Sequence, residues 1–191
     1  MNGEKNGKGK EYYSNGILIF DGEYLNGKFW NGKIKKYYND SLYFEGEYIN
    51  GEINGKAKEY FSSYNKPKFE GEYLNGKGNE FGKEYNSNGQ LEFEGEYING
   101  EKNGSGKEFY NNKLYFEGLY SNGRRSGFGK EYFPDGNLKF EGEYSFDKKE
   151  GEGKEYYDNG KLKYEGKYSY DERSGKGKEY DKDGKLIFEG E

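Results

Sequence analysis

Apolar and charged residues alternate in short segments along this chain. Residues 138–144 are an example, with the order Leu-Lys-Phe-Glu-Gly-Glu-Tyr. Because successive side chains of a β-strand point to opposite faces, this order places Phe140, Gly142 and Tyr144 on one face and the charged residues on the other. No segment has the periodicity of an amphipathic helix, and frequent glycine also disfavours helix. The pattern therefore predicts β-strands.

A triplet of an aromatic residue, an acidic residue and a glycine recurs at nearly constant spacing. Its glycines are 23 to 25 residues apart, at Gly22, Gly46, Gly71, Gly95, Gly118, Gly142, Gly166 and Gly190. A repeat of this length indicates an array of supersecondary units that bury a core only by packing on their neighbours. We therefore interpret these eight glycines as structural anchors of the repeat.

A second motif alternates with the first along the chain. It reads Gly-x-Gly-Lys-Glu-Tyr at residues 7–12, and related sequences occur at 127–132 and 175–180. Asn-Gly or Asp-Gly, as at Asn159-Gly160, lies between this motif and the next triplet. These pairs favour the positive φ that two-residue hairpin turns require. Each repeat is therefore predicted to be an antiparallel β-hairpin.

The whole chain, residues 1–191, is expected to form one all-β repeat array. Eight hairpins are expected near residues 7–24, 32–48, 55–73, 80–97, 104–120, 127–144, 151–168 and 175–191. A single hairpin is only marginally stable, so the hairpins must pair side by side. The prediction is an elongated solenoid made of a single sheet of tandem antiparallel β-hairpins.

The composition indicates what the core is made of. Glycine accounts for 33 residues, tyrosine for 23 and phenylalanine for 14, and the net charge is −5. Disordered chains are poor in aromatic residues, and each buried ring removes about 150–250 Å² from water. We expect aromatic rings to form the core, with glycines such as Gly95 and Gly142 leaving space for a ring from a neighbouring strand.

The combined motifs resemble MORN repeats, whose pattern is aromatic-x-Gly-x-aromatic, then Asn-Gly, then Gly-x-Gly. Residues 93–97 (Phe-Glu-Gly-Glu-Tyr), Asn99-Gly100 and residues 104–106 (Gly-Ser-Gly) match this pattern position by position. Tyrosine in place of tryptophan, and Lys-Glu-Tyr after the second glycine, are similar to the bacterial variant, which is also found in a family of toxin–antitoxin antitoxins. The resemblance implies a β-hairpin solenoid that binds proteins or, in some members, lipids.

The residue types of common catalytic and metal sites are missing. The chain has no histidine and no cysteine, which excludes disulfides, thiolate zinc sites and triads that use either residue. Glu94 and Glu96 share one strand face, which is one arrangement for a glycosidase pair. The same pair recurs in most repeats, so a solvated ladder with cross-strand lysines such as Lys107 and Lys130 is favoured. We expect no enzymatic activity, no cofactor and no metal.

The irregular positions of the repeat are the candidate partner-binding residues. The first connection between hairpins is one residue longer than the others and holds Phe29 and Trp30, the only tryptophan. Such an apolar pair is a candidate contact site, and the alternative is that Trp30 folds back onto the N-terminal hairpins. Glu80 replaces the usual first glycine in the third connection. Arg124 and Arg125 lie in the fifth, where a solvated loop is the alternative.

The favoured function is a non-catalytic scaffold that binds another protein, and antitoxin-like binding of a toxin falls within this interpretation. The alternative is a module that binds glycans or cell wall through exposed tyrosines, or that associates with membranes. Basic residues interspersed with glutamate, and the acidic net charge, disfavour nucleic acid and anionic membranes. Homodimerisation through the sheet ends or a sheet face stays open. Without a transmembrane segment or a secretory signal in this sequence, a cytoplasmic location is expected.

Overall fold

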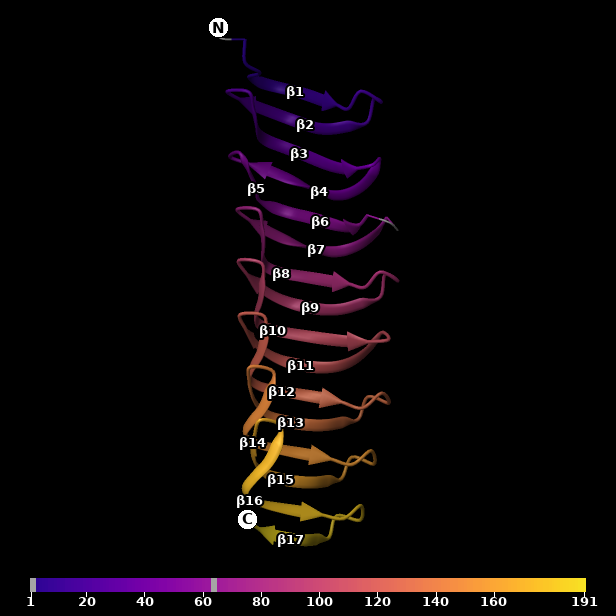
Figure 1. Cartoon of the computed structure of the whole chain (residues 1–191), viewed down its shortest axis with the longest axis vertical. Helices are drawn as coiled ribbons and strands as arrows, with labels where there is room; N and C mark the ends of the chain where they lie inside the picture. The colour runs from indigo at the N-terminus through magenta and orange to yellow at the C-terminus, as the bar shows by residue number, and fades with distance from the viewer. Residues whose placement is uncertain (1–2, 63–64) are drawn as a thin grey trace. The chain divides into compact units, whose positions relative to one another are not determined.

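The computed structural model describes residues 3–62 and 65–191, which form β-strands joined by turns (Figure 1). No helix occurs among these residues. In the strand Leu138–Ser145, Phe140, Gly142 and Tyr144 are buried while Glu143 is exposed, as the alternation predicts. The prediction of an all-β fold is confirmed.

The strands of the described residues are numbered in chain order. They are β1 (Gly7–Tyr12), β2 (Leu18–Leu25), β3 (Lys28–Tyr38), β4 (Ser41–Ile49), β5 (Glu52–Ile53), β6 (Gly55–Phe61), β7 (Lys66–Leu74), β8 (Lys77–Tyr85), β9 (Leu91–Ile98), β10 (Glu101–Tyr110), β11 (Lys113–Ser121), β12 (Arg124–Tyr132), β13 (Leu138–Ser145), β14 (Lys148–Tyr156), β15 (Leu162–Ser169), β16 (Glu172–Tyr180) and β17 (Leu186–Gly190).

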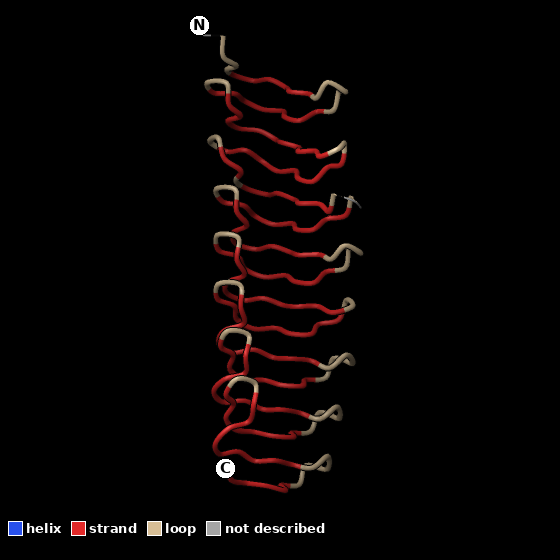
Figure 2. Tube along the Cα trace, viewed as in Figure 1, coloured by secondary structure: helices blue, strands red, loops and turns tan. Residues whose placement is uncertain are grey.

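Within each unit the strands pair antiparallel in an open sheet, and turns join them at both ends (Figure 2). Gly129 of β12 pairs with Gly142 of β13, which in turn pairs with Gly153 of β14. Lys130 pairs with Glu141 in the same register. The repeated register produces a row of glycines that crosses successive strands. The predicted sheet of antiparallel hairpins is confirmed.

The chain divides into two compact units. Unit 1 comprises Met1–Leu91 with Tyr97–Gly100, and unit 2 comprises Glu92–Glu96 with Glu101–Glu191. Strands β1 to β8 belong to unit 1 and strands β10 to β17 to unit 2, whereas the residues of β9 are divided between them.

The tightest turns do not lie where the sequence predicts them. Asn159-Gly160, expected in a two-residue turn, lies in a longer turn in which the Tyr157 N–H donates to Lys161 and only Gly160 has positive φ. The connections between hairpins instead contain two-residue turns such as Asn122-Gly123, with positive φ at both residues. Asparagine and glycine tolerate this conformation. The segments predicted to connect the hairpins are therefore β-strand on both sides of a tight turn.

One sheet face in each unit, which we call the ring face, carries the buried aromatic residues. Tyr144 packs edge to face against Phe116 and Phe140, with ring centroids 5.2 and 5.7 Å away. A Cβ added at Gly142 would lie 2.7 Å from the tip of the Phe140 ring, and one at Gly153 only 2.6 Å from it. The expected space for a ring is confirmed, but the expected origin of the ring is wrong for Gly95 and Gly142, because Phe93 and Phe140 of their own strands cover them. A ring from the neighbouring strand covers the second glycine of the motif, as Phe140 covers Gly153.

Unit 1 has a more aliphatic core. Ile34 and Ala57 replace the second glycine of the motif and are buried in a cluster with Phe20, Phe44 and Tyr73. An isoleucine fits because β3 contains one additional residue and a shift of register against β2.

Candidate functional site

Phe29 and Trp30, the first predicted binding residues, lie in β3 and not in a loop. Phe29 stacks on Phe20 of the ring face, with centroids 4.2 Å apart and ring planes 22° apart. Trp30 is the unpaired residue of the β3 bulge. Its ring lies close to Gly51, where an added Cβ would be 3.3 Å from the ring. The Gly51 N–H donates to the carbonyl of Trp30. Both side chains therefore pack on their own unit, and both remain partly accessible.

Glu80 lies in β8 with a φ of +58°, where the equivalent residue in the other repeats is a glycine of positive φ, such as Gly127. Its side chain is exposed. Together with Leu74 and Asn79 it lines a small surface pocket of about 330 Å³. The structure thus brings Glu80 next to Leu74, which is not one of the predicted binding residues.

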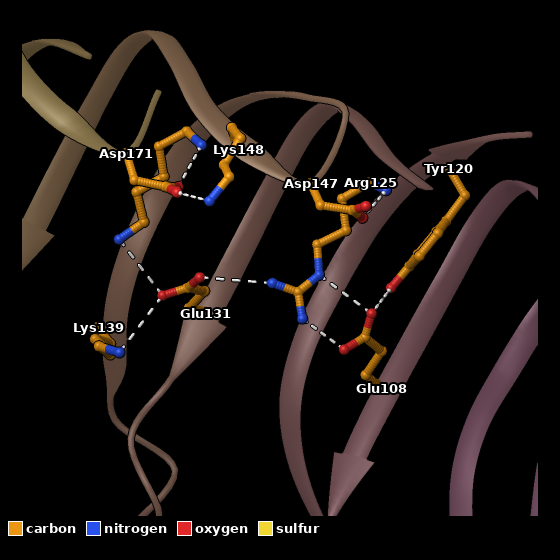
Figure 3. Close-up of polar contacts among 9 residues, drawn as sticks. Glu108, Tyr120, Arg125, Glu131, Lys139, Asp147, Lys148 and Asp171 are labelled. Atoms are coloured by element: carbon orange, nitrogen blue, oxygen red, sulfur yellow. Dashed lines mark hydrogen bonds and ion pairs between the residues drawn. The ribbon is translucent and has the colours of Figure 1, made fainter. Parts of the chain in front are cut away.

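Arg125 lies on the ring face of unit 2, where its own chain surrounds it (Figure 3). Its Nε and Nη2 donate to Glu108 at 3.1 and 2.5 Å, and Nη1 is 3.6 Å from Glu131. Only 14% of the side chain is exposed. Arg124, in contrast, is exposed, and its guanidinium lies 5.8 Å from the ring of Phe146.

Opposite charges continue from Arg125 along the ring face. Glu131 is also 3.5 Å from Lys149 and 3.6 Å from Lys139. Although burial raises the pKa of Glu108, hydrogen bonds from Arg125 and Tyr120 leave this pKa below its ordinary value. The charged groups on this face of unit 2 are therefore largely neutralised within the chain.

The residue nine positions after each ring-face aromatic covers its ring, and its chemistry differs between the units. In unit 1 this residue is Phe29 on Phe20, Ile53 in the cluster with Phe44, and Gly78 beneath Phe69. In unit 2 it is a cation 4.0 to 4.2 Å from the ring centroid: Lys102 on Phe93, Arg125 on Phe116, Lys149 on Phe140 and Arg173 on Tyr164. At this position unit 1 has apolar residues or glycine, and unit 2 has cations.

The opposite sheet face, which we call the outer face, carries the predicted ladder of lysine and glutamate. Lys58 is 3.0 Å from Glu70 in unit 1, and Lys130 is 3.9 Å from Glu141 in unit 2. Tyr60 donates to Glu45 at 2.5 Å on the same face. The predicted solvated ladder is confirmed, and its tyrosine hydrogen bonds were not foreseen.

A groove runs along the outer face of unit 1. Its volume is about 510 Å³. The backbone at Gly46, Ala57 and Gly71 lines it together with the lysine and glutamate ladder, and Phe81 also contributes. A half-exposed phenylalanine within a charged groove is an apolar contact point that the charges do not cover.

An exposed row of aliphatic side chains lies beside this groove. The row consists of Leu25, Ile49, Leu74 and Ile98, which are 41%, 42%, 52% and 52% exposed. Each residue ends a second strand of a hairpin and directly follows a tyrosine of the ring face, so strand alternation points it to the outer face. We call these four residues the apolar row. All of them belong to unit 1.

The apolar row was not among the predicted binding residues, because those residues lie where the repeat is irregular, whereas the row is regular. A signal was nevertheless present. The residue after the anchor tyrosine is aliphatic in four consecutive repeats and serine in the following three, at Ser121, Ser145 and Ser169.

The described residues show no arrangement typical of metal binding or membrane crossing. No cluster of three or more acidic residues with metal-binding geometry occurs among them. Among the same residues, none belongs to a helix long and apolar enough to span a bilayer.

Comparison with known families agrees with the repeat. A model of the MORN repeat matches residues 44–66, 93–114, 116–138 and 164–185. A model of a MORN repeat variant matches residues 5–26, 82–99 and 149–170. No curated protein matches the chain significantly, so the expected similarity to antitoxins has no support. Neither matching model describes a catalytic domain.

Proposed function

Because this chain is a MORN repeat protein, we propose that it is a non-catalytic platform that holds a partner protein on the outer face of unit 1. MORN repeats commonly mediate interactions with proteins or membranes. The observation that carries the proposal is the apolar row, because four exposed aliphatic residues at equal intervals form an apolar strip next to a groove. Such strips on folded proteins are typical of interaction sites.

The charged ladder gives this surface specificity more than affinity. Lys35, Lys58 and Lys83 alternate with Glu45 and Glu70 around the groove. Ion pairs this exposed contribute little to stability, so a partner can exchange them for its own charges at low cost. The apolar row and Phe81 would supply most of the binding energy, because buried apolar groups dominate interface energetics.

Site-specific photo-crosslinking in the native cell tests the proposal. A crosslinking amino acid at Leu74 is expected to capture a discrete protein, and the same amino acid at Tyr38 is expected to capture none. Tyr38 is a matched control because it belongs to the same unit and is also well exposed. Ile49→Ser in the Leu74 probe should strongly reduce the capture. Equal capture at both sites, or no capture at Leu74, would contradict the proposed function.

Glycan binding is a second candidate, favoured by two aromatic side chains in unit 2. Phe146 and Tyr170 are 73% and 78% exposed and have positive φ at turn positions where other connections carry asparagine. Bulky residues in this conformation are rare and are often functional. Retention on insoluble polysaccharide that is lost in Phe146→Asn and Tyr170→Asn variants would support glycan stacking, and equal retention of the variants would exclude these two rings.

A further inference from the structure

The spacing of the apolar row matches the repeat of an α-helix. Its members lie on every second strand, so neighbours along the row are about 10 Å apart at the usual strand separation. An α-helix advances about 10.5 Å in seven residues. A helix lying across the strands would therefore present one residue in every seven to each member of the row, and about 20 residues would reach from Leu25 to Ile98.

On β3, β4, β6 and β7 the charges beside the row alternate from strand to strand. Lys33 pairs with Glu47, and Lys56 pairs with Glu72, on the outer face of consecutive hairpins. Glu47 and Glu72 each precede a row member by two residues. Neighbouring strands are about 4.8 Å apart, close to the rise of three or four helical residues. A helix flank with opposite charges at this interval would therefore meet a complementary charge at each of these four strands.

From these two matches we propose that the occupant of the apolar row is an amphipathic α-helix of a partner protein. Its contact face has an aliphatic residue at every seventh position, and one flank alternates in charge. None of the described residues of this chain is helical, so the proposed helix is not among them. This inference rests on the proposed function and specifies the kind of partner.

The proposed helix contact is confined to unit 1, which holds the whole apolar row. At the equivalent positions of unit 2 the chain has Ser121, Ser145 and Ser169, whose short polar side chains offer no apolar contact. Unit 2 also has Leu119, an exposed leucine of the outer face that lies two residues before the row position. Leu119 therefore provides a matched control for the loss of an exposed aliphatic side chain.

A synthetic peptide of about 28 residues tests the inference with the full chain. The peptide carries leucine at every seventh position and alternating lysine and glutamate on one flank. Two control peptides have the same composition, one with leucine at every fifth position and one with the flank charges exchanged. Fluorescence anisotropy measures binding, and circular dichroism measures the helix gained on mixing.

The heptad peptide is expected to bind and to become more helical, and each control peptide to bind at least about tenfold more weakly. Ile49→Ser and Leu74→Ser should each weaken binding of the heptad peptide by about tenfold, while Leu119→Ser leaves it unchanged. Equal binding of all three peptides, or insensitivity to the row variants, overturns the helix proposal. If crosslinking at Leu74 still captures a protein while the heptad peptide fails to bind, the binding platform stands and the helical partner is wrong.

Discussion

The guanidinium carbon of Arg125 lies 4.1 Å from the ring centroid of Phe116, nine residues earlier in the chain. The same group donates two hydrogen bonds to Glu108, so one side chain covers a buried ring and neutralises a carboxylate. Unit 1 covers its equivalent ring, Phe20, with Phe29. The repeat therefore offers two solutions for the same position, one apolar and one cationic.

Replacing Arg125 by methionine should lower the free energy of unfolding by about 2–3 kcal/mol. Methionine retains apolar cover for the ring but leaves Glu108 without its main partner, and an uncompensated carboxylate that is partly buried is costly. Arg124→Met is the matched control. Because Arg124 is exposed, its loss should change stability by less than about 0.5 kcal/mol. Urea unfolding of both variants measures the difference, and equal effects would mean that the buried network contributes nothing.

Acid should destabilise the chain through Glu108 and Glu155. Burial raises the pKa of each carboxyl, but hydrogen bonds from Arg125 and Arg173 leave both pKa values below the ordinary 4.5. A carboxyl with a lowered folded-state pKa stabilises the fold above its unfolded pKa, and this contribution is lost as the pH falls through the folded value. Unfolding experiments from about pH 6 to 3 should show this loss. A Glu108→Gln, Glu155→Gln double variant should depend less steeply on pH over the same interval.

Alkali should destabilise the chain through its tyrosines. Burial, together with hydrogen bonds to glutamate, raises the pKa of Tyr24, Tyr132 and Tyr156 to about 12. A raised folded-state pKa contributes stability that is complete below the unfolded pKa of about 10 and is lost as the pH rises through the folded value. Ultraviolet absorbance of tyrosinate and circular dichroism, followed in one titration, should therefore change together. Ionisation of these tyrosines near pH 10 in an intact sheet would contradict the raised values.

Much of this fold can be predicted from the sequence because the same motifs recur in each repeat. Alternation in residues 138–144 correctly predicts that Phe140 and Tyr144 are buried, and the spacing of the glycines correctly predicts an array of antiparallel hairpins. The position of Arg125 does not follow, because a pair of arginines after Asn-Gly has the pattern of a solvated loop. Only the register that places residue 125 opposite Tyr120 brings its side chain onto the ring face.

The candidate site also depends on strand pairing that the sequence does not reveal. Trp30, the only tryptophan, is a predicted binding residue, yet its ring packs against Gly51 of its own unit. In the sequence, neither Leu74 nor Ile98 has a feature that marks a binding site. They form part of an apolar surface only because strand pairing aligns them with Leu25 and Ile49. Regular spacing across strands is a property of the sheet, and it is visible in the sequence only after the repeats are aligned.

Gly142→Val should destabilise the chain by more than about 2 kcal/mol. The added Cβ would lie 2.7 Å from the Phe140 ring and 2.7 Å from the Cα of Gly153, so the ring or the strands must move apart. Glu143→Val is the control, because it adds the same side chain to the exposed face of the same strand, where β-branched residues are tolerated. Thermal melts compare the two variants. A melting temperature of Gly142→Val equal to that of the control would show that the ring does not need the glycine.

Glu80→Gly should stabilise the chain while weakening the proposed interaction. The φ of +58° costs a non-glycine residue about 1–2 kcal/mol, and glycine loses about 0.5–1 kcal/mol of that gain through its greater freedom in the unfolded chain. A net gain of about 0.5–1 kcal/mol is expected in urea unfolding. The reciprocal variant, Gly127→Glu, places the same side chain at the equivalent position of unit 2, where φ is +83°, and should destabilise. Because Glu80 lines the pocket beside Leu74, crosslinking from Leu74 should decrease in Glu80→Gly despite the higher stability. Unchanged crosslinking would remove Glu80 from the binding surface, and a fall in stability would show that contacts of Glu80 outweigh the strain of its backbone.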